Sequence, residues 1–222
     1  MILLLVLIVG GLAACGGGGD GGSEAFATLV ANYKSLYGKS DEWETWMINN
    51  QARYLPTFSA STSRPSTLIV SFRYDTTPIA YAPAWPSEAA HMSALTTMAE
   101  GAYPGYVFDF QFQGSTSGSY ANVIAGIPTN LSYADGKNVY LYYETIFNHE
   151  FGHVMQLPHH YDSAATIGDG QHMPPGDTVC IMDRTSSMYC SACRVALGLP
   201  LDVNDTTAMD AAMADILGRY PY

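Results

Sequence analysis

Residues 149–160 read HEFGHVMQLPHH and hold four of the six histidines in the chain. Positions four apart share one face of an α-helix, so His149 and His153 can direct their imidazoles at the same ion. Glu150 directly follows His149 and so lies next to this face of the helix. The HExxH spacing suits zinc, with two nitrogen ligands and a carboxylate beside bound water, so we predict a metal-binding helix here. The alternative is a pair of stacked core histidines beside a surface glutamate.

A catalytic zinc site needs a third protein ligand. No glutamate follows Glu150, which excludes a glutamate ligand on a later helix. An aspartate ligand is disfavoured because the sequence around Asp169, TIGDGQ, lacks the context usual for that ligand. A histidine remains, and His159 stands six residues after His153. We predict His159 as the third ligand, with His160 as the alternative.

This spacing of histidines resembles that of the metzincins, a family of zinc peptidases whose pattern is H-E-x-x-H-x-x-G-x-x-H. Where that pattern has glycine, this chain has Gln156. The glycine lets the helix end and the backbone turn back toward the third ligand. Left-handed backbone at a residue with a β-carbon costs about 1 to 2 kcal/mol. Pro158 favours an end of the helix at the required place, because it disfavours helical backbone at Leu157.

A second feature of the metzincin resemblance lies at residues 180–183, which read CIMD. In metzincins a methionine turn forms an apolar floor beneath the metal, and the resemblance implies that Met182 takes this place. The alternative is an ordinary core methionine, since the chain has ten and methionine fills irregular gaps in many cores.

The cysteines after the motif form a second group of candidate ligands. A C-x-M followed by C-x-x-C resembles the archaemetzincins, in which four cysteines hold a structural zinc. One of those four directly follows the third histidine, where this chain has His160. The resemblance therefore implies a Cys3His zinc site of His160, Cys180, Cys190 and Cys193. The alternatives are one disulfide plus a free thiol, which export permits, and a redox pair, for which the strand-to-helix context is missing.

The N-terminus resembles a bacterial lipoprotein signal. An apolar run, MILLLVLIVGGLAA, ends at Cys15 and is followed by GGGGDGGS. We predict a signal peptide at 1–14, a lipid on Cys15, a glycine-rich tether at 15–23 and one domain at 24–222. No Lys or Arg precedes the apolar run, and a plain hydrophobic helix is the alternative.

Hydrophobic periodicity predicts the elements of that domain. We expect N-terminal helices at 24–56, a catalytic core at 67–160 and a C-terminal part at 161–222. A strand, a helix capped by Ser87 and a second strand would form a parallel pair with a crossover. The individual elements predicted are helices at 24–37, 41–54, 87–102 and 205–220, and strands at 67–74, 106–112, 120–126 and 138–143.

Composition limits the classes of partner. Hydrophobic residues make up 48% of the 222, which is enough for a sizeable core, and charged residues only 13%. The net charge is −11 and the nine Lys and Arg residues are scattered. A nucleic acid partner is therefore disfavoured, because no basic stripe could neutralise a phosphate backbone.

The expected fold class is α+β of the metzincin type, with a twisted mixed sheet, an active-site helix and a smaller C-terminal subdomain. The metzincin resemblance implies a zinc metallopeptidase that hydrolyses protein or peptide substrates, with Glu150 as general base. The lipoprotein signal predicts a place in the bacterial cell envelope, and we expect a monomer. Metzincins bind substrate as an extra strand on an exposed sheet edge, which we expect at 120–126. The alternatives are a surface lipoprotein that binds zinc and a partner without turnover, and a zinc hydrolase of non-protein amides.

Overall fold

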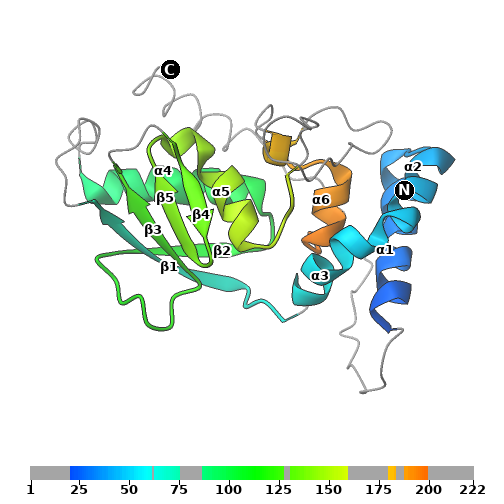
Figure 1. The fold of residues 1–222 in the computed structure, drawn as a ribbon, viewed down its shortest axis with the longest axis horizontal. Coiled ribbons are helices and arrows are strands. Elements are labelled where there is room, and N and C mark those ends of the chain that lie inside the picture. Colours follow the sequence, from blue (N-terminus) through cyan, green and yellow to red (C-terminus); the bar gives the residue numbers. More distant parts are fainter. Residues whose placement is uncertain are drawn as a thin grey trace, which may run out of the picture.

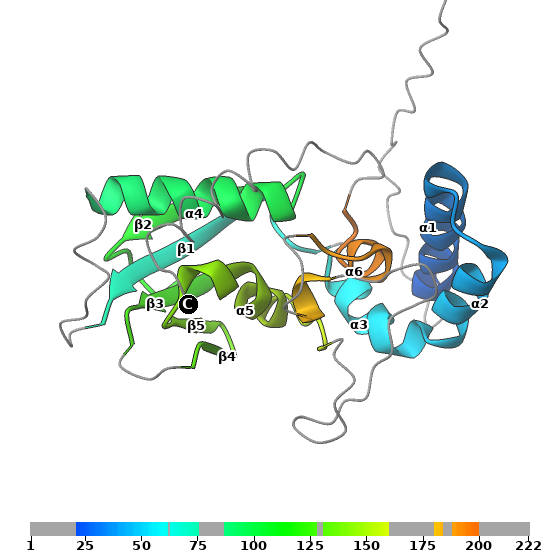
Figure 2. The same ribbon diagram turned by 90° about the horizontal axis from the view of Figure 1, so that it is seen from above.

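The computed structural model describes residues 21–61, 63–75, 87–127, 131–159, 180–183 and 188–199. A sheet with two helices forms one part of the molecule and a group of helices forms the other (Figures 1 and 2). The predicted signal peptide, Cys15, His160 and the predicted helix at 205–220 lie outside the described residues. Within those residues, no helix combines the length and the apolar character needed to cross a membrane.

The sheet has five strands in the order β2-β1-β3-β5-β4. Four strands run parallel, and β4 is antiparallel to its neighbour β5. This mixed sheet agrees with the expected α+β class. The parallel strands are β1 (Thr67–Tyr74), β2 (Val107–Phe112), β3 (Ala121–Ala125) and β5 (Asn138–Leu141), and the antiparallel strand is β4 (Tyr133–Asp135).

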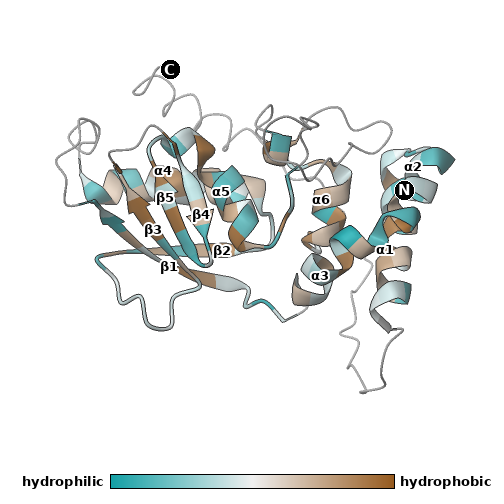
Figure 3. Ribbon diagram, in the orientation of Figure 1, coloured by the Kyte–Doolittle hydropathy of each residue, from teal (hydrophilic) through white to brown (hydrophobic). Residues whose placement is uncertain are grey.

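One face of the sheet is apolar because side chains alternate along each strand. On β1 the buried residues Leu68, Val70 and Phe72 share that face, and the register places Phe108 and Val123 beside them. Hydrophobic residues gather on β3 and β5 (Figure 3). Helices α4 (Glu88–Ala102) and α5 (Phe147–Val154) pack against each other and against the sheet.

The predicted crossover from β1 to β2 is confirmed. Ser87 caps α4 and accepts a hydrogen bond from the Ala90 amide at 3.1 Å, and β1 and β2 pair in parallel. The strand predicted at 106–112 is also confirmed, as β2 at 107–112, and its side chains alternate, since Phe108 is buried whereas Asp109 and Gln111 are exposed.

The second part of the molecule consists of α1 (Gly21–Tyr37), α2 (Asp41–Asn49), α3 (Gln51–Ser61) and the short α6 (Ser191–Ala196). Although α6 follows the sheet in sequence, it packs on α1 and α3 (Figure 1). Helix α1 starts at Gly21, inside the segment that the sequence predicts as a tether. Helix α6, which carries Cys193, is therefore packed against the N-terminal helices.

Two sequence predictions about these helices were wrong. The single helix predicted at 41–54 is interrupted at Asn50, whose side-chain amide donates to the Trp46 carbonyl at 2.9 Å and so competes with the helix backbone. The N-terminal helices, predicted to end at residue 56, instead continue through Pro56 to Ser61, the last residue of α3. Burial of Tyr54 and Phe58 on the other side of α3 outweighs the backbone bond that proline removes.

The prediction of an exposed sheet edge at 120–126 was also wrong. Strand β3 lies between β1 and β5, and all five of its residues are buried. A short, continuous apolar run is typical of an internal parallel strand. The edge strands of the sheet are instead β2 and β4, and the sequence analysis missed β4 because three residues are too few to show a periodicity.

Candidate metal centre

Helix α5 is anchored to the sheet through its aromatic side. The rings of Phe147 and Phe151 contact Phe110 and Phe108 of β2, with centroid separations of 5.7 and 5.2 Å. This packing fixes the rotation of α5 about its own axis, and so it also fixes the side of the helix on which the histidines lie.

A buried contact between a glutamate and a histidine lies at the approach to α5. The short helix η2 (Glu144–Ile146) leads into α5, and Glu144 Oε1 lies 3.2 Å from His91 Nε2 of α4. Both side chains are fully buried. The pair links α4 to the start of α5, and His91 is also bonded to the Tyr74 hydroxyl at 2.9 Å.

The structure brings together the three histidines that the sequence predicts as ligands. One nitrogen from each of His149, His153 and His159 lies within 4.8 Å of the other two. The ring of His159 stands 4.2 Å from that of His153 and 5.4 Å from that of His149, centroid to centroid. His149 is buried whereas the other two are half-buried, so the group opens on one side.

Backbone carbonyls decide which nitrogens of the first two histidines carry protons. His149 Nδ1 lies 2.8 Å from the Ile181 oxygen, and His153 Nδ1 lies 3.0 Å from the Leu157 oxygen. A carbonyl oxygen only accepts hydrogen bonds, so both Nδ1 atoms donate, and in the neutral rings both Nε2 atoms keep a lone pair. Such second contacts commonly orient metal-binding histidines.

The two Nε2 atoms stand 3.3 Å apart. Neither neutral ring has an Nε2 proton to give, so this contact is a pair of converging lone pairs, which repel unless a cation lies between them. Two nitrogens about 2.05 Å from a tetrahedral zinc are separated by about 3.3 to 3.4 Å. The observed spacing therefore fits zinc without rearrangement.

The chain reverses after α5 through left-handed backbone at Gln156, whose φ is 70°. The Gln156 amide bonds to the His153 carbonyl and the Leu157 amide to the Gly152 carbonyl, each at 2.9 Å. These two bonds define a Schellman motif, the usual helix ending at glycine. Gln156 thus takes the conformation for which metzincins use glycine, and the turn carries His159 back to the other two histidines.

Met182 lies directly against α5. It is fully buried in the short helix η3 (Ile181–Asp183). A β-carbon added to Gly152 would lie 2.5 Å from Met182 Sδ and 3.0 Å from the Tyr189 hydroxyl oxygen. Gly152 is therefore required for the close approach of helix and methionine, and the same segment supplies the Ile181 carbonyl that orients His149.

Two buried tyrosines hold the middle of α5. The hydroxyls of Tyr103 and Tyr189 contact each other and both donate to the Asn148 carbonyl, at 3.1 and 2.7 Å. Burial raises the pKa of both phenols well above the ordinary value, so they stay protonated and keep donating.

Glu150 is only 3% exposed and follows His149 directly in the helix. Its carboxylate lies in surroundings of low dielectric constant, where a charge acts more strongly on a neighbouring ion or water than it would in bulk solvent. The structure thus combines a three-histidine group with an adjacent buried acid.

The three cysteines after the motif form a second compact group. Cys180, Cys190 and Cys193 are buried free thiols whose sulfurs lie within 4.8 Å of one another. The sulfurs of Cys180 and Cys193 are 3.8 Å apart, which matches the separation of about 3.8 Å for two thiolates on a tetrahedral zinc with 2.3 Å bonds. Burial raises the pKa of the Cys193 thiol well above its ordinary value, so only a bound cation would favour its thiolate form.

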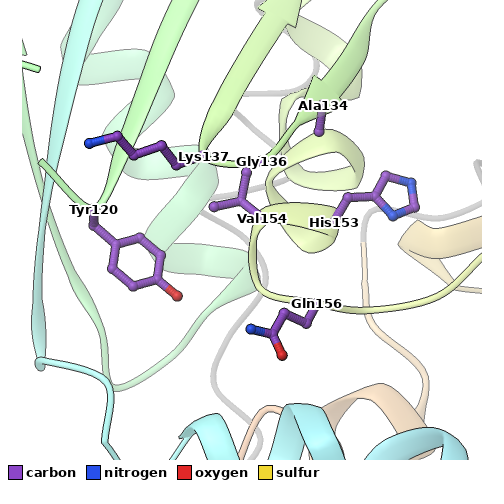
Figure 4. A pocket seen from close by; sticks show the side chains of 7 residues that line it. All are labelled: Tyr120, Ala134, Gly136, Lys137, His153, Val154 and Gln156. Carbon is purple, nitrogen blue, oxygen red and sulfur yellow. The ribbon is translucent and has the colours of Figure 1, made fainter.

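A pocket of about 480 Å³ lies beside the histidines (Figure 4). In Figure 4 the ring of His153 and the ring of Tyr120 stand at opposite sides of the lining. The Lys137 ammonium donates to the Thr116 carbonyl at 2.8 Å, so its charge is held by backbone. The lining comes from the end of α5, the β4–β5 hairpin and the residue before β3, namely Tyr120, Ala134, Gly136, Lys137, His153, Val154 and Gln156.

Comparisons with models of protein families, with curated proteins and with solved structures found no match. The chemistry of the site therefore has to be argued from its own geometry.

The sequence analysis missed several residues that shape the site. Gly152 could have been found, because a glycine inside an otherwise helical pattern often has a packing reason. Thr57 and Arg64 bond to the turn after α5, but 99 and 91 positions separate them from those partners. No local pattern could have revealed these two contacts.

Replacing Gln156 with glycine should stabilise the protein by about 0.5 to 1 kcal/mol, because glycine adopts positive φ without strain. A thermal melt of the metal-free chain measures the change. The Gln156→Ala variant is the control, since it keeps the β-carbon and should show no gain. A loss of about 1 kcal/mol in Gln156→Gly, as expected for a helical position, would contradict the left-handed turn.

Replacing Gly152 with alanine should destabilise the protein by about 1 to 3 kcal/mol, because the new methyl group overlaps Met182 in a packed core. The matched control is Gly22→Ala in α1, where the added carbon would meet only Ser59 Oγ at 3.6 Å. That change should be neutral or stabilising by up to about 1 kcal/mol. Urea unfolding measures the change in the free energy of unfolding for each variant. Gly152→Ala should lower this free energy and Gly22→Ala should not. Equal changes in the two variants would count against the close packing of Gly152 and Met182.

Proposed function

We propose that this chain is a zinc metallopeptidase of the metzincin type, a hydrolase of proteins or peptides. The observation that carries the proposal is the convergence of the three histidine nitrogens, two of them held as lone-pair donors by backbone carbonyls. The donor set and its 3.3 Å spacing suit zinc. Glu150 beside it is the acid that a zinc hydrolase needs, and a protein that only binds zinc would have no need of it.

Three further observations support a metzincin arrangement. The left-handed turn at Gln156 returns the chain to the metal group, and Met182 packs beneath α5. The mixed sheet ends in an antiparallel edge strand, β4, that contacts α5. Each of these features is one that the resemblance implies, and they come from separate parts of the chain.

The three histidines would hold the zinc ion through nitrogen. Zinc in such a site polarises a substrate carbonyl and lowers the pKa of water. The Glu150 carboxylate accepts the proton of the attacking water and passes it to the leaving amine nitrogen. The Ile181 and Leu157 carbonyls keep the Nδ1 protons of the two helix histidines in place throughout, so these ligands do not change tautomer.

Substrate binding is assigned to β4 in place of residues 120–126. Among the described strands, β4 pairs only with β5, and a peptide could extend the sheet at its other side. The pocket beside His153 lies between the β4–β5 hairpin and the end of α5, where it could receive a substrate side chain. Tyr120, Val154 and Gln156 offer apolar surface and neutral hydrogen-bonding groups there.

A second, structural zinc is proposed at the three cysteines, with His160 as the fourth ligand. The buried sulfurs have the spacing of thiolates on one ion, and closed sites of this composition stabilise folds. The proposal also keeps the lipid anchor at Cys15 and a place in the bacterial cell envelope, which rest on the sequence pattern of the first 23 residues.

Replacing Glu150 with alanine should lower peptide hydrolysis about 10²- to 10⁴-fold while zinc stays bound, because the ligands survive and only the proton acceptor is lost. Casein cleavage and zinc content of the chain from Ser23 onward measure both. His159→Ala is the comparison variant and should lose zinc as well as activity. Wild-type protein that holds zinc at the histidines but cleaves no peptide would favour the non-catalytic lipoprotein.

The cysteine site makes a separate prediction about metal content. The chain should carry two zinc ions, and the three thiols should resist alkylation until a strong chelator removes the second ion, which should also lower the melting temperature. A disulfide would instead give one zinc, at most one reactive thiol and a melting temperature that falls with reductant. That second pattern would reject the structural zinc and leave the catalytic one standing.

A further inference from the structure

The turn that carries His159 is bonded to the N-terminal helices. Thr57 Oγ1 of α3 donates to the Gln156 carbonyl at 2.7 Å. Arg64, just after α3, donates through Nη2 to the Met155 carbonyl at 2.7 Å and to the Thr57 carbonyl at 3.3 Å. Two side chains from the helical part of the molecule thus reach the end of the metal-binding helix.

These bonds fall on backbone carbonyls of the cap and the turn that follow α5, which ends at Val154. Buried carbonyls outside a helix or a strand ladder need a side chain or water as a hydrogen-bond donor. Three consecutive carbonyls, those of Met155, Gln156 and Leu157, receive donors from Arg64, Thr57 and His153 respectively. The last of these donors is itself a candidate metal ligand, so the turn and the metal group share one hydrogen-bond network.

The position of each donor suits this role. Thr57 is 1% exposed, so its hydroxyl has little competition from solvent. Arg64 is half-buried and places a positive charge at the C-terminal end of α5, where the helix dipole favours cations. Gln156 needs such support, because it holds a positive φ of 70° with a side chain in place of glycine.

We propose that Thr57 and Arg64 are positioning residues of the histidine metal site. They hold the left-handed turn so that His159 reaches the metal and the Leu157 carbonyl stays on His153. The inference rests on the three-histidine zinc site proposed above. It assigns the N-terminal helices a part in metal binding, although none of their residues is a ligand.

The test compares Thr57→Val, which keeps the shape and loses the hydroxyl, with Thr57→Ser, which keeps the hydroxyl. Zinc affinity of the histidine site is measured by chelator competition in the otherwise intact chain. Thr57→Val should weaken binding roughly 10- to 100-fold, as loss of a contact that orients ligands typically does, and Thr57→Ser should restore it. Cobalt in place of zinc should show an altered visible spectrum in Thr57→Val alone, because His159 no longer completes the ligand set.

Arg64→Met and Arg64→Lys give an independent pair, which answers the question if Thr57→Val does not fold. Arg64→Met should weaken zinc binding in the same range, and Arg64→Lys should recover part of it, since a lysine keeps the charge at the helix end. Circular dichroism of the metal-free variants checks that the fold is retained.

The combination with Gln156→Gly separates positioning from general stability. Glycine adopts the turn unaided, so Thr57→Val should weaken zinc binding less in the Gln156→Gly background than in wild type. An equal loss in both backgrounds would overturn the proposal, as would a folded Thr57→Val that binds zinc like wild type. Wild-type protein that takes up no zinc at the histidines would overturn the proposed function together with this inference.

Discussion

Two hydrogen bonds from imidazole to backbone carbonyl determine the chemistry of the site. They place the protons of His149 and His153 on Nδ1 and leave two Nε2 lone pairs facing each other at 3.3 Å. Such an arrangement is unfavourable by itself and becomes favourable with a cation between the nitrogens. The carbonyls come from the turn after α5 and from the segment with Met182, so both segments have to be in place before the histidines can act together.

The segment at 180–183 connects the two candidate metal groups. Cys180 belongs to the sulfur cluster, its neighbour Ile181 orients His149, and Met182 packs on Gly152. A shift of the backbone at Cys180 would therefore also move Ile181 and Met182, the next two residues, which contact His149 and Gly152 of α5. Ions at the sulfurs would hold this segment against α6 and so keep the Ile181 carbonyl where His149 needs it.

The helical part of the molecule supports the same site from the other side. Helices α1 and α3 pack on α6, which carries Cys193, and residues of and after α3 bond to the turn at Gln156. The N-terminal helices thus contact the turn that carries the Leu157 carbonyl, and they contact α6, whose Cys193 sulfur lies 3.8 Å from that of Cys180 beside Ile181. This arrangement accounts for a glutamine in the turn after α5, since the strain of left-handed backbone is offset by side chains that a glycine turn would not require.

The sequence alone determined the elements whose signals are local. The HExxH spacing placed two histidines on one helical face, the β-branched and aromatic residues of TLIVSFRY (67–74) marked β1 at its observed bounds, and Ser87 marked the start of α4. Only the tertiary structure decided that β4 forms one edge of the sheet, because β4 has three residues and its position depends on pairing with β5. It also decided the tautomers of the two histidines and the support of the turn by Thr57 and Arg64. These features depend on atoms that are distant in sequence, and folding alone brings such atoms within hydrogen-bond range.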